Sequence, residues 1–237
     1  MLLKRLGLEV RRIREPPPAP AIPDGDLYRP HFSPWLGRGD FRRYYEVAAP
    51  MTLLSAEAIY VLYTLLRQAA HVDGDVWECG VYKGGTAAML ATILADCAPA
   101  KRLFLFDTFA GMPDTDTGRD WHKKGDFADT SLDAVTNYVG HPELCVVRRG
   151  LIPETFVGLE PARIAFAHID VDVYKSVRDC LQFIWPRLSV GGFVVLDDYG
   201  VATCPGARAA ADEFFSNERC VPLCLVTGQA VVFKGVA

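Results

Sequence analysis

Apolar and polar residues alternate along the chain in blocks that predict a repeating order of strand and helix. Continuous apolar runs of strand length lie at residues 75–81, 102–107, 144–148, 163–170 and 191–197. Helix-like runs lie at residues 56–70, 86–97, 131–139, 174–188 and 207–215. Strands that are apolar throughout are typical of a parallel sheet covered by helices on both faces.

The pattern changes near the C-terminus. Apolar runs at residues 221–226 and 230–234 are separated by Thr-Gly-Gln, which predicts a β-hairpin. We therefore expect an α/β fold with a doubly wound, mostly parallel sheet and an antiparallel strand at its edge.

The first 50 residues are expected to form an arm outside this domain, which would occupy residues 51–237. Residues 1–15 have apolar positions at helical spacing among basic side chains, a proline-rich linker follows, and an aromatic, basic stretch begins at Phe41. The helix could bind a membrane surface or a partner. We favour packing on its own domain or on a second subunit, and a homo-oligomer is expected.

Composition excludes several classes of protein. Half of the 237 residues are hydrophobic, so a packed core is expected, and the net charge of −4 argues against a nucleic-acid-binding protein. No apolar run is long enough to cross a membrane, and charges interrupt the N-terminus, so we expect neither a span nor a secretory signal. The seven cysteines form no CxxC pair and no Cys/His cluster along the sequence. We therefore expect no disulfide framework, no zinc site and a cytoplasmic location.

The first predicted strand ends in a glycine-rich turn with the spacing E-x-G-x-x-x-G-G, from Glu78 to Gly85. A dinucleotide fingerprint and a Walker lysine are both missing, because Thr86 follows the glycines. The second strand ends at Asp107, where a carboxylate can accept hydrogen bonds from a ribose. Glu78 would repel phosphates and attract an amine. The combination favours S-adenosylmethionine, although a purely structural turn is the alternative.

Four aspartates follow two further strands. Asp170 and Asp172 end one strand, and Asp197 and Asp198 end the next. Carboxylates that meet at one sheet edge repel one another unless a cation neutralises them, and oxygen ligands suit a hard divalent ion such as magnesium. Alternation would place Asp170 and Asp172 on the same side, so that one binds metal while the other acts as a base. The alternative is that each aspartate pair forms a turn and caps the helix that follows. His168 is expected in the middle of its strand and not among the metal ligands.

Several blocks in the same order resemble the macrocin O-methyltransferase family. They read VWECGVYKGGTAAM, LFDTFAGMPD, GDFADTSLDAV, AHIDVDVYKSVRDCL, GGFVVLDDYG and CPGARAAADEFF, and the resemblance runs from about Met51 to the C-terminus. It implies a seven-stranded Rossmann-like sheet, S-adenosylmethionine as donor, and magnesium-dependent methylation of a hydroxyl, usually on a sugar.

The resemblance also implies roles for individual residues. Asp170, Asp197 and Asp198 match the metal ligands, and Asp172 matches the base. Residues expected at the donor are Thr52, Glu78, Gly80, Tyr82, Gly84, Gly85, Thr86, Asp107, Phe127, Ser131 and Asp170.

Other functions stay open at this point. A catechol-type O-methyltransferase would need the same carboxylates, and a non-catalytic nucleoside-binding protein would have no use for Asp172. Residues 111–126 are polar and aromatic, which is typical of a lid that orders around ligands. Trp121 and His122 in this segment could face the acceptor or simply be solvated.

Overall fold

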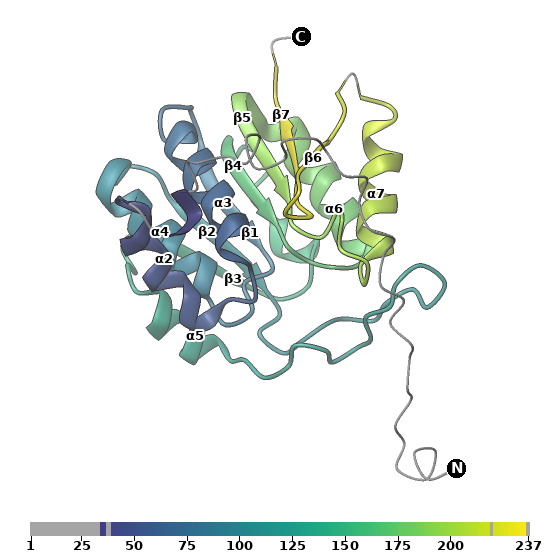
Figure 1. Ribbon diagram of the computed structural model, residues 1–237. Coiled ribbons are helices and arrows are strands. Elements are labelled where there is room, and N and C mark those ends of the chain that lie inside the picture. Colours follow the sequence, from purple (N-terminus) through teal and green to yellow (C-terminus); the bar gives the residue numbers. More distant parts are fainter. Residues whose placement is uncertain (1–33, 37–38, 219, 236–237) are drawn as a thin grey trace, which may run out of the picture. The chain divides into compact units, whose positions relative to one another are not determined.

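The computed structural model describes residues 34–36, 39–218 and 220–235. The expected N-terminal helix and proline-rich linker lie outside these residues. In the described part, a seven-stranded sheet has the order β3-β2-β1-β4-β5-β7-β6 (Figure 1). The strands are β1 (Asp75–Cys79), β2 (Leu103–Asp107), β3 (Cys145–Arg149), β4 (Ile164–Ile169), β5 (Leu188–Leu196), β6 (Leu223–Cys224) and β7 (Ala230–Phe233).

The first five strands are parallel, and the C-terminal hairpin supplies the antiparallel edge. β7 pairs antiparallel with β5, and the two-residue strand β6 lies outside it. The predicted fold class is therefore confirmed, with the antiparallel strand one place in from the edge. The strand order reverses between β1 and β4, which is the place where doubly wound sheets bind ligands.

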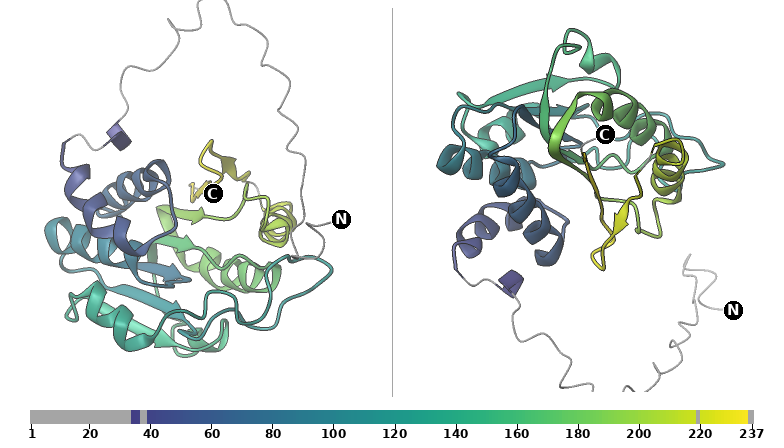
Figure 2. Two further views of the ribbon diagram at one scale, coloured as in Figure 1. Left: turned by 60° about the horizontal axis from the view of Figure 1, so that its bottom comes forward. Right: turned by 90° about the horizontal axis from the view of Figure 1, so that it is seen from above.

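Helices cover both faces of the sheet, in two groups that Figure 2 shows apart (purple to teal, and green to yellow). The first group packs with side chains such as Val76 and Leu105, and the second with Trp77 and Phe106. The helices of the first group are α2 (Phe41–Ala48), α3 (Ala56–Ala69), α4 (Gly85–Cys97) and α5 (Leu132–Val139). Those of the second are α6 (Tyr174–Ile184) and α7 (Pro205–Phe215). Alternate residues of one strand thus enter two separate cores, which explains why the strands are apolar throughout.

Two predicted boundaries differ from the observed ones. The helix expected at 174–188 is α-helical only to Ile184 and continues as the 3-10 turn Trp185–Arg187. Pro186 in that turn has no N–H to donate to an α-helical hydrogen bond. The strand expected at 191–197 already begins at Leu188.

The aromatic, basic stretch before Met51 contributes to the core. Helix α2 places Phe41, Tyr44 and Ala48 in the cluster that also contains α3 and α4. Tyr44 donates a hydrogen bond to Asp96 on α4 at 2.7 Å. Packing thus begins at least ten residues before the expected boundary at Met51.

No helix of the described residues is both long and apolar enough to cross a membrane.

Candidate active site

A cavity of about 770 Å³ opens at the carboxyl ends of the parallel strands. It is lined by the glycine turn after β1, the end of β2, and the aspartates that follow β4 and β5. Predicted site residues in its wall are Thr52, Gly80, Tyr82, Thr86, Asp107, Phe127, Asp170, Asp172, Asp197 and Asp198. The remaining predicted residues, Glu78, Gly84, Gly85 and Ser131, lie elsewhere. One cavity therefore brings together the two motifs that the sequence separates by about ninety residues.

Backbone geometry accounts for the glycines of the turn. Gly80 has a φ of +87°, and a Cβ there would lie 1.7 Å from the carbonyl oxygen of Asp170. Gly84 is left-handed and precedes α4, while a Cβ on Gly85 would meet the backbone of Met51 at 2.6 Å. Gly80 thus lets β1 approach the metal-ligand candidate Asp170, and Gly85 lets the segment before α3 approach α4.

Asp107 has a structural task in the same turn. One carboxylate oxygen accepts hydrogen bonds from the N–H groups of Val81 and Tyr82, at 2.7 and 2.9 Å, and the other accepts one from Phe109 at 2.7 Å. The ribose contact predicted for Asp107 is not tested by these bonds, since Oδ1 accepts only from Phe109 and keeps one free lone pair. Asp107 also fixes the path of the glycine turn.

The segment after the predicted lid packs against the glycine turn. Phe127 packs edge-to-face on Tyr82 with the ring centroids 5.4 Å apart, and the Tyr82 hydroxyl donates to Asp129 at 2.8 Å. Both Phe127 and Tyr82 have positive φ angles, of 60° and 50°. Ser131 does not line the cavity. Its side chain accepts a hydrogen bond from the N–H of Ala134 and caps α5, which accounts for a serine at this position.

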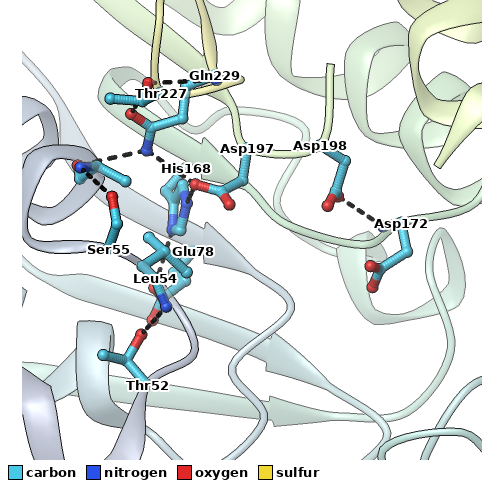
Figure 3. A network of polar contacts seen from close by, with 11 residues as sticks. Thr52, Leu54, Ser55, Glu78, His168, Asp172, Asp197, Asp198, Thr227 and Gln229 are labelled. Carbon is cyan, nitrogen blue, oxygen red and sulfur yellow. Dashed lines mark hydrogen bonds and ion pairs between the residues drawn. The ribbon is translucent and has the colours of Figure 1, made fainter. Parts of the chain in front are cut away.

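The four aspartates lie together, but in two overlapping groups. Carboxylate oxygens of Asp170 and Asp197 lie within 4.8 Å of each other and of a ring nitrogen of His168. A second group consists of Asp170, Asp172 and Asp198, whose carboxylate oxygens also lie within 4.8 Å of one another. Figure 3 shows Asp197 turned toward His168 and Asp198 turned toward Asp172. The predicted ligands Asp170, Asp197 and Asp198 are therefore neighbours with Asp170 between them, not one closed triad.

Burial and mutual repulsion make this cluster electrostatically costly. Burial raises the pKa of Asp170 well above its usual value, and the charges of Asp197 and Asp198 raise it further. Burial likewise raises the pKa of Asp198, with added repulsion from Asp172 and Asp197. A bound cation would relieve this repulsion, and an all-oxygen donor set suits magnesium, calcium or manganese. The residues present thus fit a hard divalent ion.

His168, expected only as a mid-strand residue, belongs to this site. Its Nδ1 lies 3.0 Å from Glu78 Oε1 and its Nε2 lies 3.3 Å from Asp197 Oδ1, and the imidazole is fully buried. Burial alone lowers the pKa of His168, but the hydrogen bonds to Asp197 and Glu78 outweigh it and raise the pKa well above its usual value. Each ring nitrogen of His168 therefore has a carboxylate as its hydrogen-bond partner, an arrangement that favours the protonated ring.

Gln229 completes the support of Asp197. Its amide nitrogen donates to Asp197 Oδ1 at 2.8 Å and to the backbone carbonyl of Ala58 at 3.3 Å (Figure 3). Neither His168 nor Gln229 was predicted from the sequence as a site residue. For His168, the only signal was its position two residues before Asp170 on a buried strand. Gln229 gave no signal beyond a polar residue in a hairpin turn.

Asp172 does not cap α6. The residue before that helix is Val173, and the N–H of Tyr174 donates instead to Asp120 at 2.9 Å. Asp172 has a φ of 55°, its own N–H donates to Asp198 Oδ2 at 2.9 Å, and it lines the cavity. β4 ends at Ile169, so this turn, and not strand alternation, directs Asp172. Burial raises the pKa of Asp172. The charge of His122 and the hydrogen bond with Cys204 lower this pKa, but burial has the larger effect.

The segment 111–126 is attached to the second helical layer. Asp120 accepts hydrogen bonds from Tyr174 and from the N–H of Asp116, and Arg119 pairs with Glu213 on α7. His122 turns inward, with its Nε2 3.6 Å from Asp172 Oδ1, whereas Trp121 is 66% exposed. His122 therefore contacts the site at Asp172, whereas Trp121 is not among the residues that line the cavity. Lid movement stays a prediction.

The strand order, the cavity and the carboxylate cluster define a Rossmann-like α/β domain of the class I methyltransferase type. Among solved structures, the O-methyltransferase NovP matches with a TM-score of 0.70 over 78% of this chain and 83% of that one, at 24% identity. This match shows the shared fold.

Residues 41–234 match the macrocin-O-methyltransferase (TylF) family, and the chain belongs to it. The expected family is thus confirmed. The 8-demethyl-8-(2,3-dimethoxy-alpha-L-rhamnosyl)-tetracenomycin-C 4'-O-methyltransferase of Streptomyces olivaceus is 32% identical over 62% of this chain and 60% of its own length. The demethyldecarbamoylnovobiocin O-methyltransferase of Streptomyces niveus is 29% identical over 61% of this chain and 59% of its own length. The matched part of the chain therefore spans about three fifths of each of these relatives.

Proposed function

We propose that the protein transfers the methyl group of S-adenosylmethionine to a hydroxyl on the sugar moiety of a small-molecule natural product. The observation that carries this proposal is the single cavity lined by both the glycine turn of β1 and the aspartates after β4 and β5. A donor site and an acceptor site must adjoin for direct transfer, because the nucleophile has to align with the methyl carbon.

The donor would lie over the glycine turn. Gly80 allows close approach to the backbone, and Thr86 stands in the first turn of α4, where free N–H groups favour a carboxylate. Asp107 lines the same region and retains one lone pair, on Oδ1, for a ribose hydroxyl. Glu78 is fully buried beneath the turn, so we assign it to support and not to direct donor contact.

Asp170, Asp197 and Asp198 would hold a divalent cation. Their burial and repulsion support this assignment, as does the hydrogen bonding that keeps Oδ1 of Asp197 toward His168 and Gln229. When bound, a magnesium ion orients a hydroxyl group and makes it more acidic.

Asp172 would act as the general base. It lines the cavity and it is not needed to cap α6. In the reaction, the acceptor O–H bond breaks and its proton passes to the Asp172 carboxylate. The oxygen lone pair then forms a bond to the methyl carbon as the carbon–sulfur bond breaks, which leaves S-adenosylhomocysteine. The raised pKa of Asp172 supports this role, because it brings the carboxylate closer to the pH at which a base must take and release a proton.

The sugar acceptor is supported by the family and by the relatives. The name of the Streptomyces olivaceus relative includes a rhamnosyl group. We therefore infer a deoxysugar glycoside as the first acceptor class to test.

The test is methyl transfer by the purified protein from isotope-labelled S-adenosylmethionine with magnesium. The acceptor panel contains rhamnosides of aromatic aglycones, the free sugar, and catechols, and products are identified by mass spectrometry. We expect labelled rhamnoside in the presence of magnesium and none with Asp172→Asn over the same interval. Label on catechols alone would replace the sugar proposal with a catechol-type activity, and donor binding without transfer to any hydroxyl would favour a non-catalytic role.

A further inference from the structure

Beside the cavity, at Asp172, three side chains of different chemistry meet from three segments. His122 Nε2 lies 3.6 Å from Asp172 Oδ1, and Cys204 Sγ lies 3.5 Å from the same oxygen. All three ligand atoms lie within 4.8 Å of one another. His122 comes from the segment 111–126, Asp172 from the turn after β4, and Cys204 from the residue before α7. The cluster is invisible in the sequence because no two members are within thirty residues of each other.

The separations suit a zinc ion. Zinc binds nitrogen and oxygen at about 2.0–2.2 Å and sulfur at about 2.3 Å in a tetrahedral arrangement, which sets the ligand atoms roughly 3.3–3.7 Å apart. Asp172 Oδ1 lies 3.6 Å from His122 Nε2 and 3.5 Å from Cys204 Sγ, and both separations fall in this range. A thiolate, an imidazole and one carboxylate are the donors of zinc sites that keep a fourth position open. Magnesium prefers oxygen ligands, so this set discriminates against it.

The other nitrogen of His122 has the partner that a metal-bound histidine needs. Nδ1 lies 3.3 Å from Asp126 Oδ2, which also accepts the N–H of Lys123 at 2.9 Å. A carboxylate on the far nitrogen fixes the tautomer and turns Nε2 toward the metal. This contact is independent of the three ligand positions and points to the same use.

Cys204 is placed to become a thiolate when a cation arrives. It is the residue immediately before α7, so the positive end of the helix faces it, and its side chain is buried. When zinc binds, the S–H bond breaks and its proton passes to solvent as the sulfur–zinc bond forms.

We propose that His122, Asp172 and Cys204 form a zinc site distinct from the group of Asp170, Asp197 and Asp198, and that zinc bound there inhibits methyl transfer. Inhibition follows because an Asp172 carboxylate that ligates zinc cannot accept a proton. The ion would also tie the segment 111–126 to α7 and hinder any movement of that segment. The binding part stands on geometry alone, whereas the inhibitory part rests on the proposed function of Asp172.

Cobalt(II) provides a test of binding without turnover. It occupies zinc sites, and a thiolate ligand gives it a charge-transfer absorption that oxygen ligands do not. Cobalt is titrated into the full-length protein with saturating magnesium, and then displaced with zinc. We expect one thiolate-ligated cobalt per chain in the wild type, loss of that band in Cys204→Ser, and affinity at least tenfold weaker in His122→Ala.

Cys97→Ser is the matched control, because Cys97 is an exposed cysteine at the end of α4 (Gly85–Cys97). Its band should equal that of the wild type. A band that survives in Cys204→Ser, with that variant melting at the wild-type temperature, would overturn the site. His122→Ala alters a partly exposed loop residue and provides a second test if Cys204→Ser does not fold.

Activity supplies the separate test of inhibition. Methyl transfer is measured against zinc concentration at saturating magnesium, with each variant normalised to its own zinc-free rate. Half-inhibition should require at least tenfold more zinc in Cys204→Ser than in wild type or Cys97→Ser. Equal zinc sensitivity in all three would overturn the inhibitory role and assign the effect to the Asp170 group. An inactive wild type that still shows the cobalt band would count against the proposed function and not against the site.

Discussion

His168 and Glu78 form a buried pair in the middle of the sheet, with His168 Nδ1 3.0 Å from Glu78 Oε1 and both side chains fully inaccessible to solvent. The pair joins β1 to β4, and through Asp197 it reaches the end of β5. The second oxygen of Glu78 has no hydrogen-bond partner among the described residues. The position of Asp197, after β5, therefore depends on a network that begins at Glu78 on β1, two strands away.

Replacing Glu78 should destabilise the fold strongly. Glu78→Ala leaves the buried His168 ring without one of its two carboxylate partners, and breaking a buried ion pair costs about 3–5 kcal/mol. Glu78→Gln keeps an acceptor for Nδ1 and should recover part of this loss. Chemical denaturation measures both. The control is Asp73→Asn, which removes an exposed partner of Arg163 and should change stability little. Equal losses for Asp73→Asn and Glu78→Ala would contradict the importance of the buried pair.

Neutralising Asp198 should stabilise the protein when no divalent ion is present. Asp198→Asn removes one charge from a buried cluster whose members repel each other, yet it can still accept the N–H of Asp172. Thermal melting in chelator should therefore give a higher Tm for the variant than for wild type. Added magnesium should raise the Tm of wild type more than that of the variant. A variant that melts lower in chelator and gains equally from magnesium would argue against metal binding here.

Gly80 should tolerate no side chain, whereas Gly125 should tolerate one at modest cost. Both have a φ of +87°, but a Cβ on Gly80 would lie 1.7 Å from the Asp170 carbonyl oxygen and one on Gly125 meets nothing within 4 Å. The left-handed conformation alone costs an alanine about 1–2 kcal/mol. Gly125→Ala should lower the free energy of unfolding by about 1–2 kcal/mol. Gly80→Ala should lower it by clearly more and should also weaken donor binding. Calorimetric titration of S-adenosylmethionine and denaturation measure the two effects, and indistinguishable variants would refute the close approach.

Asp172→Asn should separate chemistry from structure. Asparagine adopts positive φ readily but cannot take a proton, so turnover should fall by about 10²–10⁴-fold while donor affinity and Tm change little. Rates at saturating substrates and donor titrations provide the measurement. Turnover close to wild type would exclude Asp172 as the base.

Asp120→Ala should loosen the segment 111–126. Asp120 is nearly buried and joins the N–H of Tyr174 on α6 to the N–H of Asp116 within the segment. Its loss removes the cap of α6, worth about 1 kcal/mol, and frees one attachment of the segment. Limited proteolysis should then cut within 111–126 faster than in wild type, and donor with acceptor should slow the cut. Asp114→Ala, at an exposed position in the same segment, is the control and should cleave at the wild-type rate.

The sequence by itself determined the fold and the region of the site. Apolar runs long enough for strands alternate with helix-like runs, and a sheet covered on both faces is the arrangement that buries them all. Carboxyl ends of parallel strands share one edge, so Asp107, Asp170 and Asp197 could be assigned to one cleft before any contact was known. Ordered motif blocks indicated the family, which the match over residues 41–234 confirms.

Only the tertiary structure decided which side chains meet within that cleft. His168 reaches Glu78 and Asp197 because β4 lies between β1 and β5, a strand order that the local pattern does not encode. Asp120, not Asp172, caps α6 because a loop from fifty residues earlier passes the start of that helix. His122 and Cys204 likewise become neighbours of Asp172 because loops that are distant in the sequence pass one another at this edge of the sheet. Contacts between loops depend on the path of the chain after the strands have paired, and residue periodicity carries no information about that path.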